Sequence, residues 1–325
     1  MHAHTISRDR SRMPAEEMWQ MKRLIALMTV TGIALLGFLA IGGPAALATM
    51  PGENGRIAFS LDRGSGGEIY TIRADGTDLQ RLTHLEGNAI APDWSPDGTR
   101  IVFWLEDQAL YVMNRHGGGL HRVTAPGGQA AFTPDGDHLV YSGGNRRGRY
   151  GIFLMRADGS DAPGRRLTTR WPPAGTSGDA NPEVSPDGRT VTFVRRNGVF
   201  GVNIDGSDVR ELVSPNLSVT IKHDWAPDGS RIVYTSPYDY SRNPNVFAID
   251  PDGSDPEMLT SVTGKLGALT GTYSPNGRWI VIRVENLDRE SFRIFKMRPE
   301  GSPRTLITEL TSSPRFLDWG PSPSS

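Results

Sequence analysis

The sequence contains no cysteine, and this absence removes several kinds of chemistry at once. Without a thiol the chain can form no disulfide bond and no thiolate metal site, and it has no cysteine nucleophile and no N-terminal cysteine for lipid attachment. If the chain is exported, non-covalent contacts alone must hold its fold together.

The 325 residues also lack an excess of either charge, since 35 Lys and Arg residues oppose 36 Asp and Glu residues. This balance does not suggest a nucleic-acid binder. Hydrophobic residues make up 37% of the chain, which is enough for a globular protein with a sizeable core. Beyond Gly55 there is no convincing helical periodicity, only short alternating runs separated by Gly, Pro, Asn and Asp. The sequence therefore predicts an all-β protein.

Familiar catalytic motifs are missing as well. The sequence has no Gly-x-Ser-x-Gly elbow, no His-Glu-x-x-His, no Walker loop and no dinucleotide-binding fingerprint. We therefore expect no cofactor and no metal, and we favour a function without catalysis.

Charge is absent from one long stretch near the N-terminus. Leu24 to Gly52 contains no charged residue, and Lys22-Arg23 lie just before it, which is the layout of an export signal. Residues 21–48 are interpreted as a signal peptide that is cleaved after Ala48. The alternative is a membrane anchor built on residues 24–41, because that run approaches the roughly 20 residues that span a bilayer.

The expected location follows from this segment. The protein should be exported to the periplasm or another extracytoplasmic site, and it should contact the membrane only if the N-terminal segment is retained. Residues 1–20 are polar and are interpreted as an extension or as a misassigned start.

One short motif recurs from Trp94 to the end of the chain, and Trp94-Ser95-Pro96-Asp97-Gly98 is its clearest copy. Ser, Pro, Asp and Gly suit the four positions of a tight turn, because Pro presets φ and Gly accepts the left-handed region. A large apolar residue precedes each turn and a β-branched run follows it, so each copy predicts a strand, a turn and a strand. The other copies begin at Phe132, Val184, Trp225 and Tyr273, with a worn copy at Trp319.

Two further strands complete each repeat. A third strand, such as Leu110-Tyr111-Val112-Met113, leads through a turn such as Asp252-Gly253-Ser254-Asp255 into a short fourth strand such as Gln80-Arg81-Leu82-Thr83. The repeats recur about every 45 residues, within the roughly 40 to 50 residues of known propeller blades. The sequence thus predicts a six-bladed β-propeller of four-stranded antiparallel blades over residues 54–320, followed by a tail at residues 321–325.

The ends of the repeat array indicate how the ring closes. Asn54 to Phe59 resembles a second strand without its first, and Arg315 to Trp319 resembles a first strand without its second. We expect the C-terminal strand to complete the first blade, because this pairing removes two exposed sheet edges.

The Trp-Ser-Pro-Asp-Gly hairpin, the Tyr-x-Met third strand and the Arg-Leu-Thr fourth strand resemble the Pro-Asp propeller repeats of the TolB-like family of exported bacterial proteins. The resemblance covers residues 54–320. It implies an extracytoplasmic scaffold that binds other proteins. The separate N-terminal α/β domain of true TolB has no counterpart in the sequence, so we expect a TolB-like propeller and not TolB itself.

Acidic residues invite two other interpretations. The turn Asp250-x-Asp252-Gly253-Ser254-Asp255 could bind calcium. Its Gly lies at the fourth position, whereas a calcium-binding loop of the EF-hand type needs Gly at the sixth, and a hairpin turn is favoured. Asp93, Glu183, Asp224 and Asp318 precede the large apolar residue of the motif and could form an acidic ring at the channel. We favour carboxylates that accept hydrogen bonds from neighbouring backbone. The apolar position itself accepts Val, which indicates packing between blades.

Loop length varies on one face only. In a four-stranded meander, the loops between second and third strands and the linkers between blades emerge on one face, here called the variable face. The two classes of short turn emerge on the other, here called the constant-turn face. We expect a partner to dock on the variable face, led by the third blade. The candidate binding residues are Arg146, Arg147, Arg149, Tyr150, Arg170, Trp171, Tyr238 and Tyr240, with Lys222 and His223 at the channel mouth.

The preferred function is an exported, non-catalytic, monomeric scaffold that engages a protein or an anionic envelope polymer. The alternative is a carbohydrate lyase or hydrolase working at the channel mouth. That alternative would require His, Tyr, Arg and carboxylate side chains to converge from several inner strands.

Overall fold

The fold is described from a computed structural model. The structure describes residues 52–62, 64, 66–106, 109–124, 127–145, 149–168, 178–219, 222–237, 243–286, 288 and 291–323. The expected signal or anchor segment lies outside these residues.

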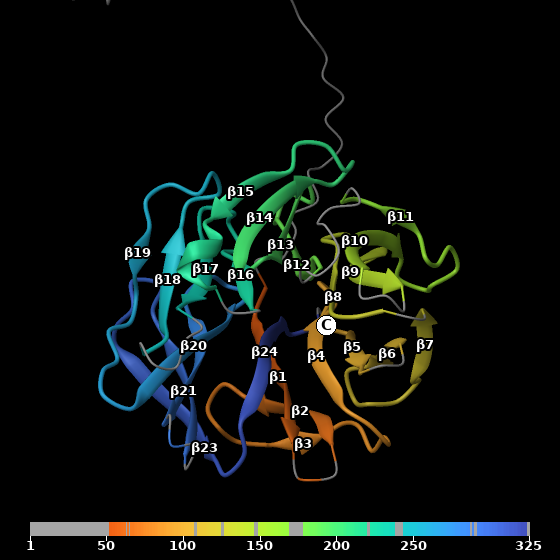
Figure 1. The fold of residues 1–325 in the computed structure, drawn as a ribbon. Helices are drawn as coiled ribbons and strands as arrows, with labels where there is room; N and C mark the ends of the chain where they lie inside the picture. Colours follow the sequence, from red (N-terminus) through yellow and green to blue (C-terminus); the bar gives the residue numbers. More distant parts are fainter. Residues whose placement is uncertain are drawn as a thin grey trace, which may run out of the picture. The chain divides into compact units, whose positions relative to one another are not determined.

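The described residues form six four-stranded antiparallel sheets arranged around an axis (Figure 1), so the predicted all-β six-bladed propeller is confirmed. Blade 1 holds β24 (Pro314–Pro321), β1 (Asn54–Asp62), β2 (Gly67–Arg73) and β3 (Gln80–Arg81). Blade 2 holds β4 (Ala89–Trp94), β5 (Arg100–Leu105), β6 (Ala109–Asn114) and β7 (His121–Thr124). Blade 3 holds β8 (Ala130–Phe132), β9 (His138–Asn145), β10 (Arg149–Arg156) and β11 (Arg165–Arg166).

The other three blades repeat the same order from the axis outward. Blade 4 holds β12 (Ala180–Val184), β13 (Thr190–Arg195), β14 (Gly198–Asn203) and β15 (Arg210–Val213). Blade 5 holds β16 (His223–Trp225), β17 (Ile232–Ser236), β18 (Asn245–Ile249) and β19 (Glu257–Met258). Blade 6 holds β20 (Leu266–Tyr273), β21 (Ile280–Asn286), β22 (Phe292–Met297) and β23 (Arg304–Leu310). One short 3-10 helix, η1 (Pro215–Leu217), lies between blades 4 and 5 in the sequence.

The ring closes in blade 1 as the sequence predicts. β24 pairs with β1 in an antiparallel register that places Trp319 opposite Ile57 and Pro321 opposite Asn54. The first and last described strands of the chain therefore share one sheet, and β24 covers the inner edge of β1.

The Ser-Pro-Asp-Gly turns have the conformation that their residues dictate. Gly98 has a φ of 66°, in the left-handed region where a side chain is disfavoured, and its N–H donates to the carbonyl of Ser95 at 2.9 Å. Ser95 donates its hydroxyl to Asp97 at 2.5 Å, and Asp97 also accepts the N–H of Thr99. The turn is thus held by its own polar atoms, which explains why it recurs with little change.

The Asp-Gly-Ser-Asp turns likewise use their carboxylates locally. Asp252 accepts both the N–H and the hydroxyl of Ser254, at 2.9 and 2.6 Å, and Gly253 has a φ of 87°. The interpretation of this sequence as a hairpin turn is confirmed.

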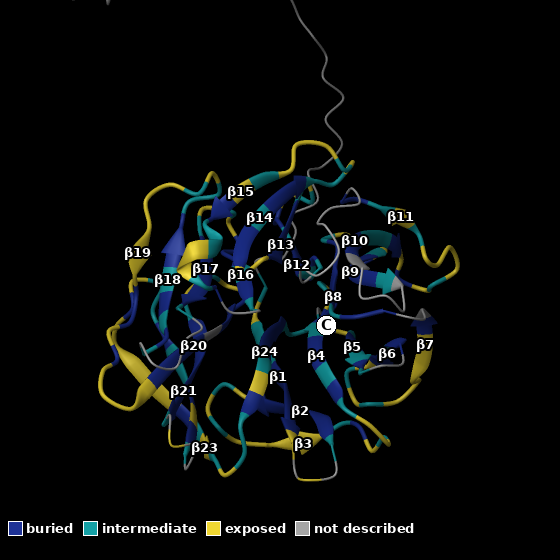
Figure 2. Cartoon of the chain, viewed as in Figure 1, coloured by how far each residue is buried: buried dark blue, intermediate teal, exposed yellow. Residues whose placement is uncertain are grey.

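Figure 2 shows that the strands of the blades are largely buried. Their buried side chains meet those of neighbouring sheets and form the hydrophobic core between blades. Trp94 in β4 packs with Ile101 and Phe103 of its own blade and with Ala58 and Ile69 of blade 1. It lies against the backbone of Gly320, where any larger residue would collide with the indole ring. Packing between blades at the apolar position is therefore confirmed. Among the described residues no helix has the length and apolar character needed to cross a membrane.

Candidate functional site

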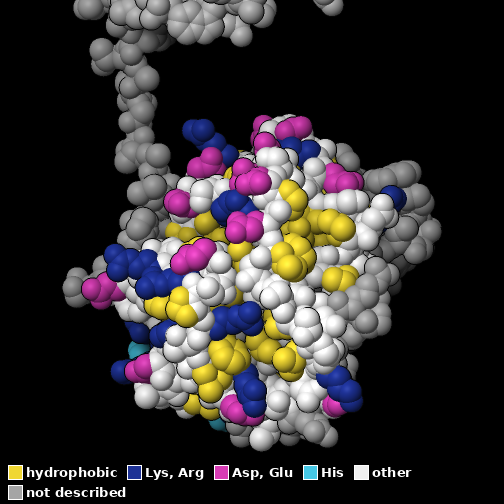
Figure 3. Space-filling view, turned by 90° about the vertical axis from the view of Figure 1, so that its left-hand side faces the viewer, with side chains coloured by type: hydrophobic (Ala, Val, Ile, Leu, Met, Phe, Trp, Pro, Cys, Tyr) yellow, Lys and Arg dark blue, Asp and Glu magenta, His cyan; other side chains and the backbone are white. Residues whose placement is uncertain are grey.

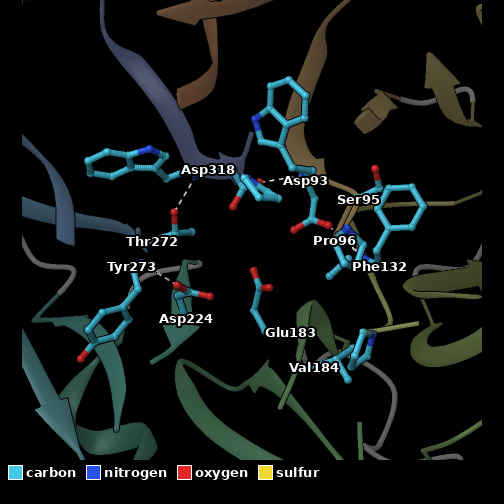
Figure 4. Close-up of a pocket in the computed structure, with 15 residues that line it drawn as sticks. Asp93, Ser95, Pro96, Phe132, Glu183, Val184, Asp224, Thr272, Tyr273 and Asp318 are labelled. Carbon is cyan, nitrogen blue, oxygen red and sulfur yellow. Dashed lines mark hydrogen bonds between the residues drawn. The ribbon is translucent and has the colours of Figure 1, made fainter. Parts of the chain in front are cut away.

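A cavity lies on the propeller axis, where the inner strands of all six blades converge (Figure 4). Its wall includes Ser95, Pro96, Pro134 and Pro321, so it opens beside the turns of the constant-turn face. Asp93, Glu183, Asp224 and Asp318 come from four different blades and point toward one another across this space. We call these four residues the axial carboxyl cluster.

Three of the four carboxyl groups bind the next blade. The residue just before the apolar position accepts the backbone N–H of the apolar residue in the following blade, an arrangement that we call the inter-blade link. Asp318 accepts from Trp94 at 2.7 Å, Asp93 from Phe132 at 2.9 Å, and Asp224 from Tyr273 at 2.7 Å. The predicted role of these aspartates as acceptors of backbone hydrogen bonds is confirmed.

A fourth link uses a hydroxyl group. Thr272 occupies the same repeat position in blade 6, and its Oγ1 accepts the N–H of Trp319 at 2.8 Å. Thr272 is not among the predicted acceptors, because only carboxylates are expected to fill this role. The signal was present, since Thr272 aligns with Asp93, Asp224 and Asp318 in the repeat.

The link is interrupted on either side of blade 4. The side chain of Ala131 in blade 3 has no acceptor atom for the N–H of Val184. Glu183 of blade 4 accepts a hydrogen bond from Lys222 of blade 5 instead. Lys222 Nζ lies 2.6 Å from Glu183 Oε1, and the two side chains are 12% and 11% exposed. Glu183 therefore accepts a hydrogen bond from the ammonium group of Lys222, and not from backbone as expected.

Two more side chains of blade 5 reach into blade 4. His223 Nε2 lies 2.9 Å from Thr192 Oγ1, and Trp225 Nε1 donates to the same oxygen at 3.0 Å. His223 is fully buried, and burial lowers its pKa to about 3, with the nearby charge of Lys222 adding to the effect. A neutral ring without exposed surface cannot contact a docked partner, so we do not retain His223 as a binding residue.

Burial controls the protonation of the axial carboxyl cluster. Burial first, and then the charges of neighbouring carboxylates, raise the pKa values of Asp93 and Asp224 well above their usual range. Burial also raises the pKa values of Asp318 and Glu183, although Lys222 opposes the rise in both. Burial alone would lower the pKa of Lys222, but the surrounding carboxylates, Glu183 foremost, outweigh it and raise that pKa. Lys222 is thus the cation that the cluster surrounds.

The arrangement is suited to holding blades together. Each aspartate of the cluster has one oxygen engaged by backbone, and Glu183 is engaged by Lys222. Within the described ranges, no group of three or more His, Asp or Glu side chains has the geometry to hold a metal ion.

Most of the other predicted binding residues lie outside the described residues. Arg149 and Tyr150 belong to β10, which pairs with β9, and only their backbone is described. The remaining predicted residues lie outside the described ranges; they are Arg146, Arg147, Arg170, Trp171, Tyr238 and Tyr240.

Comparison with known proteins identifies relatives of the propeller. Residues 44–199 match the family described as the TolB beta propeller domain. The Tol-Pal system protein TolB of Nitratidesulfovibrio vulgaris is 33% identical over 94 residues, which cover 27% of this chain and 21% of that protein. An uncharacterized protein of Agrobacterium fabrum is 28% identical over 202 residues, which cover 56% of this chain and 65% of that protein. The chain thus spans less than two thirds of the length of either relative.

Solved structures agree at the level of the fold. The crystal structure of TolB from Acinetobacter baumannii superposes with a TM-score of 0.67 at 18% identity, covering 82% of this chain and 67% of that one. At this identity the likeness shows a shared propeller fold, and function must be argued from the site.

Proposed function

Because this chain carries a TolB-like β-propeller, we propose that it is an exported, non-catalytic binding scaffold that works outside the cytoplasm. The observation that carries the proposal is that the aspartates lining the axial cavity are already hydrogen-bonded. Propeller proteins offer this space to ligands, yet its aspartates here are engaged by backbone of the next blade.

The same observation weighs against a carbohydrate lyase or hydrolase at the channel. Acid and base groups of such enzymes must be free to reach the bond that breaks. Asp93, Asp224 and Asp318 each hold a main-chain N–H, and Glu183 is paired with Lys222. Releasing any of them would weaken a contact between blades.

The proposed partner is a protein or an anionic envelope polymer that docks on the variable face. The Tol-Pal name of the relative from N. vulgaris supports an envelope assembly. Basic and aromatic residues in the long segments of blades 3 and 5 supply the contact types found at binding hot spots. These residues are Arg146, Arg147, Arg149, Tyr150, Arg170, Trp171, Tyr238 and Tyr240.

A charge-reversal experiment tests this docking face. Arg146, Arg147 and Arg149 are replaced together by Glu, and a control protein carries Glu at Arg73, Arg156 and Arg189, three exposed residues beside the constant turns. Each protein is incubated with a bacterial envelope extract and, separately, with immobilised polygalacturonate, and captured material is quantified at low and moderate salt.

We expect capture to fall only in the first variant, and wild-type capture to weaken as salt rises, because exposed charge contacts are screened. Protein captured from the extract would identify a protein partner, and retention on the resin would identify a polymer. Equal capture by both variants would refute docking on the variable face.

A further inference from the structure

Blade 6 has fewer acidic residues on the constant-turn face than blades 3, 4 and 5. Its first turn contains Asn276 where blades 2 to 5 have an aspartate. Its second turn contains Pro303 where blades 1, 3, 4 and 5 have an aspartate. The aspartates at the first position are Asp97, Asp135, Asp187 and Asp228, and those at the second are Asp78, Asp161, Asp208 and Asp255. Blade 6 therefore lacks both of these aspartates, which blades 3, 4 and 5 each have.

Positive charges gather at the same end of this blade. Arg278 follows the first turn, Arg298 precedes the second, and Arg304 begins β23 beyond it. The register places Met297 opposite both Ile280 and Arg304, so these residues lie on adjacent strand ends. Glu300 is the single acidic residue on the two turns.

These cations have no carboxylate partner within the described part of the chain, and for Arg298 this differs from its counterpart in blade 1. Arg298 corresponds in the repeat to Arg73 of blade 1, which pairs with Asp78 at 3.4 Å. No such ion pair is formed by Arg278, Lys296, Arg298 or Arg304 among the described residues. The charge of this surface is thus left for a group outside the blade.

Trp279 holds part of this charge in place. The guanidinium carbon of Arg298 lies 4.1 Å from the centre of the indole ring, and Lys296 Nζ lies 5.4 Å from it. Lys296 is also fixed by a 2.9 Å hydrogen bond to the carbonyl of Ala74. Arg298 Nη1 also donates to the carbonyl of Arg278 at 3.5 Å. Stacking on the ring leaves the other in-plane N–H groups of the guanidinium available for a carboxylate.

Apolar surface lies next to the charge. Arg304, Thr305 and Leu306 are consecutive exposed residues at the start of β23, and Leu306 is 49% exposed. β23 is also the longest of the six outer strands, with seven residues against two to four in the others. Figure 3 shows the flank that bears blades 5 and 6, where Lys and Arg, Asp and Glu, and hydrophobic side chains are interspersed.

We propose that this blade 6 basic surface, formed by Arg278, Trp279, Lys296, Arg298, Arg304 and Leu306, binds an acidic segment of a partner protein. It is separate from the variable face and goes beyond the function proposed above. Unpaired arginines select carboxylates, which they bind with two parallel hydrogen bonds. Arg and Trp are the residues enriched in protein interfaces, and an exposed Leu beside them favours a peptide with apolar side chains over a uniformly charged polymer.

The test uses a fluorescein-labelled peptide of repeating Glu-Glu-Leu, and fluorescence anisotropy gives its affinity for the full chain. A matched peptide contains Gln in place of Glu. We expect the protein to bind the acidic peptide and not the neutral one, and Arg298→Glu with Arg304→Glu to raise Kd about tenfold or more, which is about 1.4 kcal/mol. Leu306→Ser should raise Kd about threefold.

The chain offers a matched control. Arg189 occupies the same turn position in blade 4 as Arg278 in blade 6, and each donates its N–H to the turn residue two positions earlier. That residue is Asp187 in blade 4 and Asn276 in blade 6. Arg278→Glu should weaken peptide binding about threefold or more, whereas Arg189→Glu should leave Kd within about twofold.

The outcomes separate the alternatives. Equal losses in Arg189→Glu and Arg278→Glu would mean that only general charge attraction is measured, and would overturn the proposal. Polygalacturonate is tested as a second ligand. If Arg298→Glu with Arg304→Glu weakens binding of polygalacturonate more than binding of the peptide, the ligand of this surface is an acidic polymer and the proposal of a protein segment is overturned. Unchanged peptide binding after Arg146, Arg147 and Arg149 are replaced by Glu is expected, because those residues belong to the variable-face proposal. Unchanged thermal unfolding shows that each variant is folded.

Discussion

Near the propeller axis, the hydrogen bonds between consecutive blades are of two chemical kinds, and the difference shows how one repeat can be held in two ways. Around blades 5, 6, 1, 2 and 3, a short side chain accepts a backbone N–H of the next blade, through Asp224, Thr272, Asp318 and Asp93 in turn. Between blades 4 and 5 the contact is made by side chains alone, which are Lys222 with Glu183 and both His223 and Trp225 with Thr192.

The two kinds of contact respond differently to their surroundings. A hydrogen bond to backbone in a repeated geometry tolerates exchange of Asp for Thr, as Thr272 demonstrates. The contact between blades 4 and 5 depends on a buried ion pair and on a buried neutral histidine, so its strength depends on pH. We therefore expect protonation of Glu183 or His223 to weaken the blade 4–5 contact directly.

The largest expected effect lies in the backbone-linked part of the ring. Trp94→Ala should lower the free energy of unfolding by about 3 to 5 kcal/mol, because Trp94 is 6% exposed and fills the space between blades 1 and 2. Val184→Ala at the equivalent position of blade 4 should cost about 1 to 2 kcal/mol. Chemical denaturation measures both. Similar values would mean that the apolar position contributes equally whether or not the link is present.

Lys222→Met tests the ion pair. It should lower stability at pH 7 by about 2 to 4 kcal/mol, because Glu183 would be left charged in a buried site. Without Lys222 the pKa of Glu183 rises further, so the cost should be greatest at neutral pH and shrink as pH falls toward the usual range of a glutamate. Adding Glu183→Gln to this variant should recover most of the loss. No recovery would mean that Lys222 acts through the rest of the axial carboxyl cluster.

His223 provides a second pH test. Its contribution should make the wild type less stable as pH falls, whereas the cost of Lys222→Met shrinks as pH falls. Its pKa is lowered to about 3 in the folded protein, so the stability that the neutral ring contributes is present above about pH 6.5 and is lost as pH falls toward 3. Between pH 7 and pH 5, wild type should lose about 2 kcal/mol relative to His223→Gln. Parallel stability profiles of the two proteins would show that the ring is not held neutral by the fold.

The smallest expected effect is a gain. Ala131→Thr would supply blade 3 with the hydroxyl that Thr272 uses in blade 6, and should raise stability by about 0.5 to 1 kcal/mol through a new hydrogen bond to Val184. Ala131→Val is the control of similar shape. A gain in both variants would indicate added packing and not a new link.

Much of this architecture follows from local sequence. The Ser-Pro-Asp-Gly turns hold themselves through contacts within a few residues, as the bonds of Ser95 and Asp97 show, so their position and their number could be predicted. The closure by β24 followed from counting strands in the repeats. The backbone-accepting role of Asp93, Asp224 and Asp318 followed from the cost of burying a carboxylate without partners.

The contacts between blades 4 and 5 could not be predicted in the same way. Lys222 and Glu183 are 39 residues apart, and His223 and Thr192 are 31 residues apart. No local rule fixes which side chains meet across such a separation. His223 was expected near a channel mouth because it begins an inner strand, whereas its burial depends on the neighbouring blade, which sequence periodicity does not describe.

The pairing of β24 with β1 also has a kinetic consequence. The hydrogen bond from Trp319 Nε1 to the carbonyl of Gly55 joins residues 264 positions apart, and closing so long a loop is slow. During synthesis β1 emerges first and its innermost partner last, so blade 1 stays incomplete while the other five blades can already form. Until β24 arrives, the inner edge of β1 is an open template for pairing with other chains. We expect chaperones that protect nascent chains to matter most for this blade.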